Sequence, residues 1–406
     1  MSLIKRIVAD PSLDVREKED RLAAELRRLP GFGTMEAYDA IVSGSPAIVT
    51  RYAANYLAVL PDYVDEKRHA VEHVLRSRPA DLNDIAYLVR FLSPETADEL
   101  VRRCLENQEE RSGALFSAAE AFPHVVRAYE ERIEDSGIRI LLWPGAPKKW
   151  LVAALLAWRQ RRELTALEQI SFIRTDEARE ALLHLRANLP DEFMPIYETV
   201  VENAWVFPDT REPSVYPRTL MGLVGDRQVS RHHMGAGYGP LVPVCPLCQR
   251  PAVRVLTLAR DTLPFKVSGT ADPSLFWLPC DCDAVEYLYV RFTDQGIEGL
   301  VTEVGPPDNR ENWLPGRLAL ELLDHPNQYG RSTDAIPGQS EHQVGGYPPW
   351  VQTDRFPRCA ECGQGMRYLA SMDSGKTAFG RMPFEGMLFG FWCDHDSISV
   401  TFEQSL

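Results

Sequence analysis

Seven of the eight cysteines lie in the second half of the chain, in two sets with metal-ligand spacing. The first set is Cys245, Cys248, Cys280 and Cys282, and the second is Cys359, Cys362 and Cys393, followed by His395. In each set a C-x2-C pair precedes a second pair, C-x-C or C-x-H, after a gap of 31 or 30 residues. A C-x2-C turn directs two thiolates to one point, and four such ligands suit tetrahedral zinc. The sequence therefore predicts two zinc ions per chain.

The sequence around the first cysteine set recurs around the second. Residues 233–240 and 342–349 both read H-x3-G-Y-x-P, and Cys245 and Cys359 are 114 positions apart. Cys282 and His395 are 113 positions apart, so the offsets are nearly constant and indicate an internal duplication. This arithmetic makes His395 the fourth ligand of the second site. The rival ligand His342 is disfavoured, because its counterpart in the first copy would then be a fifth ligand there.

The predicted zinc sites are expected to be structural. Four protein ligands fill a tetrahedral shell and leave no position for water. Each ion would then contribute on the order of 10 kcal/mol to the folding of its module. The sequence contains no H-E-x-x-H and no G-x-S-x-G motif. The pair His232 and His233 could act as ligands or as a base, but spacing identifies no acidic partner. We therefore expect a protein that is not an enzyme and has no catalytic residues.

The elements that position these residues differ between the two halves. Residues 1–205 hold 6 of the 26 glycines and 11 of the 30 prolines, and their apolar residues recur at the helical period. After them come strand-like segments with alternating β-branched and aromatic residues, such as residues 285–292. We expect an α+β multidomain protein whose helical part is a HEAT-like repeat stack or a bundle. Its expected parts are an α-helical repeat-like domain (1–205), a β-rich zinc module 1 (206–302), a loop-rich connector (303–339) and a β-rich zinc module 2 (340–406).

Composition and charge restrict the partners. The chain has 406 residues, 45% of them hydrophobic, and a formal charge of −14. This charge opposes binding to nucleic acid and to an anionic membrane but permits a basic protein partner. The longest clean apolar stretch, residues 150–158, is too short to cross a bilayer, and the N-terminus lacks the apolar region of a signal peptide. We expect a cytoplasmic protein with reduced thiols.

The second cysteine set lies within a longer stretch of sequence that resembles known proteins. The segments VGGYPPWVQ, CAECGQGMRYLASMD and MLFGFWCDH resemble two related groups, and a weaker copy lies near residues 230–302. One group is the YwqG-like bacterial family of unknown function, and the other is the C-terminal domain of relatives of programmed cell death protein two. The resemblance implies partner binding, not catalysis. The second group looks like dedicated chaperones of a basic ribosomal protein, and some YwqG-like proteins are suspected immunity proteins.

These observations together predict a bacterial, non-enzymatic, zinc-stabilised scaffold that binds a basic protein as an immunity protein against a toxin or as a chaperone. Gly345, Gly346, Tyr347 and Trp350 are candidates for a binding lip. The alternative is that Trp350 belongs to the core and that the glycines shape a turn. Two other functions remain open. One is a hydrolase with its site between the helical and β parts, and the other is a zinc-ribbon nucleic-acid binder.

Overall fold

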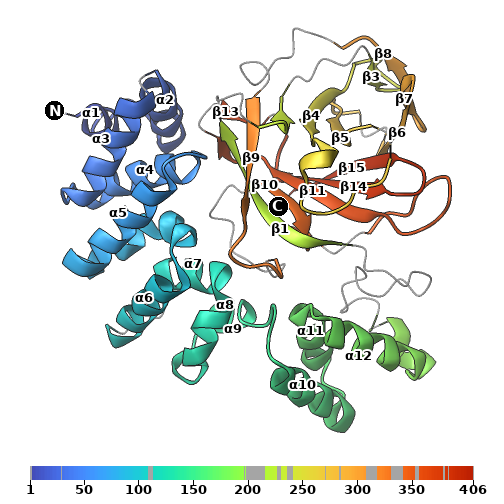
Figure 1. Cartoon of the computed structure of the whole chain (residues 1–406), viewed down its shortest axis with the longest axis horizontal. Coiled ribbons are helices and arrows are strands. Elements are labelled where there is room, and N and C mark those ends of the chain that lie inside the picture. The colour runs from blue at the N-terminus through green and yellow to red at the C-terminus, as the bar shows by residue number, and fades with distance from the viewer. Residues whose placement is uncertain are drawn as a thin grey trace.

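The chain folds into a helical part followed by a β-rich part, as the sequence predicts, and the β-rich part is dominated by one large curled antiparallel sheet (Figure 1). A computed structural model describes residues 2–28, 30–107, 113–195, 197, 215–225, 230–235, 241–269, 271–282, 285–307, 318–330, 342–352, 356–377, 380–382 and 384–405. Three features expected from the sequence lie wholly or partly outside the described residues: the end of the helical domain, much of the connector, and the G-Y-x-P motif of the first copy.

Among the described residues, the helical part contains twelve α-helices and three 3-10 helices. The α-helices are α1 (Leu3–Val8), α2 (Val15–Arg27), α3 (Pro30–Val42), α4 (Ala47–Ala58), α5 (Val64–Ser77), α6 (Pro94–Glu106), α7 (Gly113–Ala121), α8 (Pro123–Val126), α9 (Ser136–Ile140), α10 (Lys148–Arg161), α11 (Leu164–Ile173) and α12 (Asp176–Ala187). The 3-10 helices are η1 (Pro79–Phe91), η2 (Arg127–Arg132) and η3 (Asp191–Phe193). In the described part of the chain, no helix has the length and apolarity needed to cross a membrane.

Local signals in the sequence fix where the helices begin. Asp14 and Glu17 form a capping box at the start of α2, in which each side chain accepts a hydrogen bond from the other residue's backbone N–H. At α6, the Ser93 hydroxyl accepts from the backbone of Thr96, and Pro94 occupies the first helical position. Each cap satisfies backbone donors that a helix end otherwise leaves without partners.

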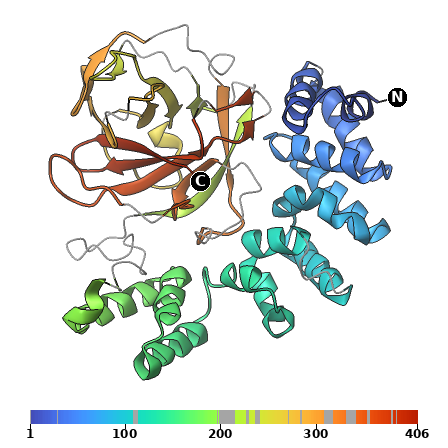
Figure 2. The ribbon, with the colours of Figure 1, turned by 180° about the vertical axis from the view of Figure 1, so that it is seen from behind.

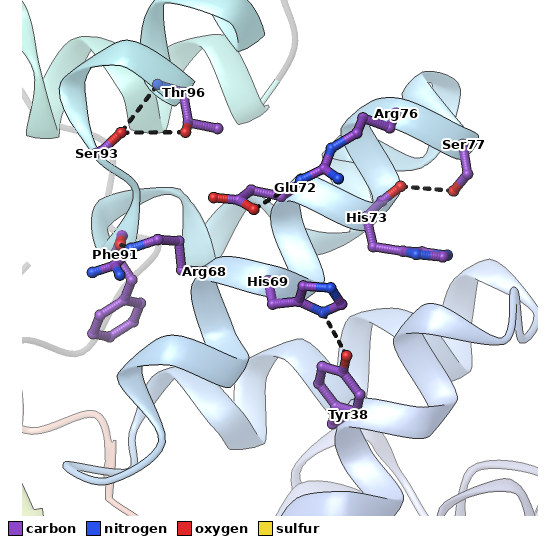
Figure 3. A network of polar contacts seen from close by, with 10 residues as sticks. All are labelled: Tyr38, Arg68, His69, Glu72, His73, Arg76, Ser77, Phe91, Ser93 and Thr96. Carbon is purple, nitrogen blue, oxygen red and sulfur yellow. Dashed lines mark hydrogen bonds and ion pairs between the residues drawn. The ribbon is translucent and has the colours of Figure 1, made fainter.

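The helices pack on their near neighbours in the chain and form an arc that curves around one side of the sheet (Figures 1 and 2). Polar side chains reinforce contacts between neighbouring helices (Figure 3). The Tyr38 hydroxyl of α3 lies 2.5 Å from Nδ1 of His69 on α5, and Nε of Arg68 donates to the carbonyl of Phe91 at the end of η1. This neighbour-on-neighbour packing is the arrangement of helical-repeat proteins.

The second part is dominated by one eleven-stranded sheet with the order β5-β4-β2-β9-β1-β10-β11-β14-β15-β6-β7. Its strands are β1 (Tyr216–Gly225), β2 (His233–Met234), β4 (Val253–Thr257), β5 (Ser274–Trp277), β6 (Leu288–Thr293), β7 (Gly296–Gly299), β9 (Leu318–Asp324), β10 (His342–Gly346), β11 (Arg367–Asp373), β14 (Met387–Cys393) and β15 (Ile398–Gln404). Smaller pairs join β3 (Val242–Val244) to β8 (Glu303–Gly305) and β12 (Lys376–Thr377) to β13 (Gly380–Arg381), and η5 (Arg260–Thr262) follows β4. The sheet curls until β5 returns to β15, where the Trp277 indole N–H donates to Glu403 at 3.2 Å.

The two copies of the repeated sequence form matching halves of this one sheet. In the first copy β2 pairs with β4 and β4 with β5, and in the second β10 pairs with β11 and β11 with β14. Each copy has a register irregularity at the equivalent place, between Arg254 and Leu256 and between Tyr368 and Ala370. The paired strands β1 and β9 join the halves, so β9, within the range expected to be a connector, is a central strand.

The sheet and the helical arc share buried contacts. Met221 and Leu223, on one face of β1, belong to the hydrophobic core of the helices, with Leu323 of β9 packed against them. After β9, the Asn327 amide donates to the carbonyl of Glu120 at 3.0 Å. The sheet is therefore packed against the arc through apolar side chains and polar contacts together.

Candidate metal centres

Each metal centre begins with a turn of the same geometry. In the first, the backbone N–H of Cys245 donates to the carbonyl of Arg250, and that of Gln249 donates to the carbonyl of Cys245, at 2.9 and 3.0 Å. In the second, Cys359 donates to Gln364 and Gly363 to Cys359, at 2.8 and 3.0 Å. The residue after the second cysteine is left-handed in both, with φ of 60° at Gln249 and 68° at Gly363. This turn brings the two thiols of each C-x2-C pair to one side.

The first centre contains four cysteines, as predicted. The ligand atoms of Cys245, Cys248, Cys280 and Cys282 all lie within 4.8 Å of one another. Cys245 is buried, whereas Cys248 is exposed, so the group lies at the surface with one edge in the protein. All four cysteines are free, and their chemistry suits a soft, tetrahedral ion.

The second centre contains three cysteines and an aspartate. The ligand atoms of Cys359, Cys362, Cys393 and Asp396 lie within 4.8 Å of one another. Oδ2 of Asp396 lies 3.1 Å from Sγ of Cys359 and 3.5 Å from Sγ of Cys393. Zinc–oxygen and zinc–sulfur bonds of about 2.0–2.2 and 2.3 Å in a tetrahedron separate O and S by roughly 3.5 Å. This set can therefore hold an ion with the carboxylate as fourth ligand.

The two histidines considered for the second centre lie elsewhere. Nδ1 of His395 is 2.8 Å from Oδ1 of Asp396, and its side chain is 70% exposed. His395 thus contacts the carboxylate rather than joining the ligand group. Buried His342 accepts a hydrogen bond at Nδ1 from the backbone of Asp373, at 3.2 Å. The constant offset between the two copies aligned His395 with Cys282 and so predicted His395 as the fourth ligand. In the structure the fourth ligand atom belongs to the next residue, Asp396. The repeated aspartate at 283 and 396 was the sequence signal for it, although residue 283 lies outside the described part.

The acid–base properties of the thiols fit sites that need a cation. Burial and neighbouring thiols raise the pKa of Cys280 to about 12. Burial also acts to raise the pKa of Cys245, but backbone N–H donors of Cys248 and Leu247 hold it at about 7, below the ordinary thiol value. In the second centre burial raises the pKa of Cys393 well above its ordinary value. Several thiolates cannot crowd together without a positive ion, and a bound ion deprotonates them.

Asp394, between two residues of the second closing turn, anchors that turn to the sheet. Its carboxylate accepts from the backbone of Ser268 at 2.7 Å and from the buried Tyr216 hydroxyl at 3.3 Å. Arg367 of β11 forms an ion pair with it at 3.3 Å. These contacts fix the direction in which Cys393 and Asp396 present their ligand atoms.

The candidate binding lip is mostly buried. Trp350 is 3% exposed and stacks on Phe389, with ring centroids 4.9 Å apart. Gly345 and Gly346 have φ of 68° and 69°, and a Cβ at Gly346 would lie 1.9 Å from the Thr219 hydroxyl. The Tyr347 hydroxyl donates to the carbonyl of Arg174 at the end of α11. Trp350 and the two glycines are therefore buried, whereas Tyr347 is half-buried. Trp350 is core and the glycines shape a tight turn, the alternative the sequence had left open.

Of the histidine pair at 232–233, the buried His232 is held by hydrogen bonds to its neighbours in the fold. Nδ1 of His232 accepts from the backbone of Ala259 at 3.1 Å, so Nε2 carries the proton and donates to the Thr262 hydroxyl. Burial lowers the pKa of His232 to about 4. The nearby Ser230 hydroxyl donates to the carbonyl of Leu320. The imidazole is therefore neutral and fully occupied by structural hydrogen bonds.

The fold and the sites define a class of protein: a helical array packed on a duplicated sheet that carries two four-ligand, cysteine-rich clusters. Known proteins add little to this description. The chain is 26% identical over 165 residues to the uncharacterized protein YpfL of Salmonella typhimurium. The match covers 39% of this chain and 38% of that protein, so it spans well under half of the relative's length. No family model matches the sequence, and no solved structure matches it.

Proposed function

We propose that this protein is a non-enzymatic scaffold, stabilised by two structural zinc ions, that binds a basic protein partner. The observation that carries the proposal is the completeness of the two ligand sets, each with four protein ligand atoms within 4.8 Å of one another. A tetrahedral zinc with four protein ligands has no open position at which to activate water. Zinc is favoured over other ions because three or four thiolates select a soft, tetrahedral metal.

The charge of the molecule supports a basic partner. The formal charge of −14 on a 406-residue chain favours encounter with a positively charged protein and disfavours nucleic acid. A toxin and a nascent ribosomal client are both partners of this kind. The resemblance of residues 342–395 to YwqG-like proteins and to programmed cell death protein two relatives favours these two roles, immunity protein or chaperone.

The hydrolase alternative has less support. A cavity of about 620 Å³ lies beside β9, lined by polar residues that include Ser230, His232 and Glu321. Its histidine and serine are engaged in the structural hydrogen bonds described above, and they do not contact each other as a nucleophile and base would. The cavity could serve such a reaction only after those bonds rearranged.

Affinity purification from the native cell tests the proposal. The tagged, zinc-loaded full chain should retain one basic protein in a stoichiometric complex whose affinity falls as salt rises. A co-expressed toxin whose activity the chain suppresses would support immunity, and a newly made ribosomal protein that it keeps soluble would support a chaperone. Turnover of a small substrate by the purified chain, with no partner recovered, would contradict the proposal.

A further inference from the structure

One helix of the arc presents a stripe of exposed side chains with an apolar centre and positive ends. This helix, α10, lies on the side of α11 that is away from the sheet (Figures 1 and 2). Lys149, Val152, Leu156 and Arg159 follow one another at spacings of three, four and three residues, so they share one face of α10. All four are exposed, Val152 by 44% and Leu156 by 48%. We call these four residues the α10 stripe.

The ends of the α10 stripe are positive in a chain whose formal charge is −14. α10 contains four basic residues and no acidic residue. Arg161 pairs with Glu163, but among the described residues no ion pair involves Lys149 or Arg159. Lys149 also lies in the first turn of α10, which no side chain caps and where a positive charge opposes the helix dipole. A carboxylate brought close to this turn would relieve that unfavourable interaction.

The spacing of the stripe favours another helix as its occupant. Side chains that alternate at three and four residues form the seam along which two helices pack. Val152 and Leu156 are the apolar centre of this seam. Its charged ends, Lys149 and Arg159, are ten residues apart, which is about 15 Å along a helix. A helix of matching chemistry has two apolar residues in its centre and an acidic residue beyond each of them.

Two other occupants fit the stripe less well. A second copy of this chain would place its own Lys149 or Arg159 beside these residues in either helix direction, and like charges repel. A membrane surface favours Trp or Phe on the exposed face of a helix. In α10 the tryptophans turn inward: Trp158 is fully buried, and Trp150 packs edge-on against Trp143 with ring centroids 4.7 Å apart. The net negative charge of the chain also opposes an anionic bilayer.

We propose that the α10 stripe binds an acidic amphipathic helix of a partner protein. Val152 and Leu156 pack against the two central apolar side chains of that helix, and Lys149 and Arg159 pair with its carboxylates. The ligand of this site has the opposite charge to the basic protein proposed above. The inference therefore concerns a separate interaction and does not rest on the proposed function.

Fluorescence anisotropy on the full, zinc-loaded chain tests the inference with a labelled helical peptide as the probe. The peptide is blocked, alanine-rich and about 16 residues long, so that it spans the stripe. It has two leucines four residues apart in its centre and a glutamate three residues beyond each leucine. This peptide should bind, with an affinity that falls as salt rises, and the same peptide with lysine in place of glutamate should not. Equal binding of the two peptides would overturn the inference.

Charge reversal on the chain tests the pairing itself. In the double variant Lys149→Glu and Arg159→Glu, the affinity for the glutamate peptide should fall at least tenfold, and the lysine peptide should now bind. Lys149→Glu also places a negative charge in the first turn of α10, so the thermal midpoint should not fall. Arg16→Glu is the matched control, because Arg16 is likewise exposed and second in its helix, α2. It should bind the glutamate peptide as wild type does. A double variant that is folded but does not bind the lysine peptide would contradict the charge pairing.

Leu156→Asp tests the apolar centre of the stripe. It should weaken the glutamate peptide about tenfold. Ile48→Asp, at a side chain of α4 that is 49% exposed, should leave the affinity unchanged. Vesicles of phosphatidylcholine and phosphatidylserine, and sedimentation of the chain alone, test the other two occupants. Vesicle binding or a dimer that is present in wild type and lost in Leu156→Asp would overturn the inference in favour of a membrane or a second copy.

Discussion

Sγ of Cys362 and Sγ of Cys393 lie 3.7 Å apart, although 30 residues separate them in the chain. A disulfide requires about 2.05 Å. A tetrahedral zinc with bonds of about 2.3 Å places its sulfurs roughly 3.8 Å apart. The turn after β10 and the end of β14 thus hold two free thiols at the separation that a shared ion requires.

Cys362→Ser should reduce the metal content from two ions per chain to one and lower the thermal midpoint. Serine is a poor ligand for a soft ion, and the lost binding free energy is folding free energy for the closing turn. Elemental analysis and thermal unfolding measure both effects. β10 and β11 are part of the sheet that packs on the helices. We therefore expect limited proteolysis to show that the variant is cleaved more readily than wild type, also in parts of the sheet outside the second module.

Cys104→Ala controls for the loss of a cysteine. Cys104 is buried in α6, outside both clusters. The variant should keep two ions and lose only the stability that a small core cavity costs. Equal metal content in Cys362→Ser and wild type would show that the second cluster does not bind an ion.

Asp396→Asn and His395→Ala distinguish the two candidates for the fourth ligand of the second centre. We expect Asp396→Asn to lower the affinity of the second centre for its ion by roughly tenfold or more. His395→Ala should keep the ion bound, with an affinity only slightly lower than in wild type. Cobalt substitution reports the change, since d–d absorption depends on the ligand set. The reverse pattern, with the ion lost in His395→Ala alone, would restore the histidine as the ligand.

Zinc affinity should rise with pH. Without an ion, burial and neighbouring thiols raise the pKa of Cys280 to about 12, so this thiol is protonated at neutral pH. Binding must displace that proton, and each displaced proton changes the apparent affinity by tenfold per pH unit. Lowering the pH from 7.5 to 5.5 should therefore weaken zinc at least a hundredfold. Competition with a colorimetric chelator measures this, and a flat profile would mean that the thiols are not the ligands.

Much of the metal-binding geometry could be read from the sequence because it is local. A C-x2-C turn has one geometry wherever it occurs, which is why Cys245 and Cys359 were identified correctly as members of the clusters. The fourth ligand of the second cluster was not local in this sense. His395 and Asp396 are adjacent, and only the path of the turn anchored by Asp394 decides which side chain reaches the sulfurs.

The fold class could be predicted from the sequence, but the way in which the strands and the helical part are joined could not. Caps such as Asp14 and Ser93 mark helices directly. The strand β9, Leu318–Asp324, reads LALELLD, a helix-favouring composition, and it is a strand because β1 and β2 pair with it on either side. Periodicity alone likewise did not indicate that Met221 and Leu223 pack into the helical core.

A buried lysine at the junction of the two parts makes stability depend on pH. Lys67 of α5 is fully buried, donates to the carbonyl of Leu60 and lies 4.3 Å from the Phe91 ring centroid. Burial, reinforced by Arg90, lowers its pKa from 10.5 to about 7, while Asp62 and Glu321 oppose the shift. Between pH 7 and 10.5 the unfolded chain binds more protons at this residue than the folded chain. Its contribution to stability therefore rises with pH across that window.

Lys67→Met tests this effect. The variant should be more stable than wild type at pH 6, by roughly 2 kcal/mol, and the difference should shrink by pH 9.5. Denaturant unfolding at both pH values measures the difference. Lys149→Met, at an exposed position of α10, should show no such change between the two pH values. A difference that grows as the pH rises would contradict the burial of a charged lysine.

We propose that two closed, four-ligand zinc sites hold this sheet together. Zinc analysis combined with X-ray absorption on the native protein tests it most directly. We expect two zinc ions per chain with seven sulfur ligands and one oxygen ligand between them, and with all four ligands of each ion from the protein. Fewer than two ions, a water ligand on either zinc, or cysteines found as disulfides would contradict it.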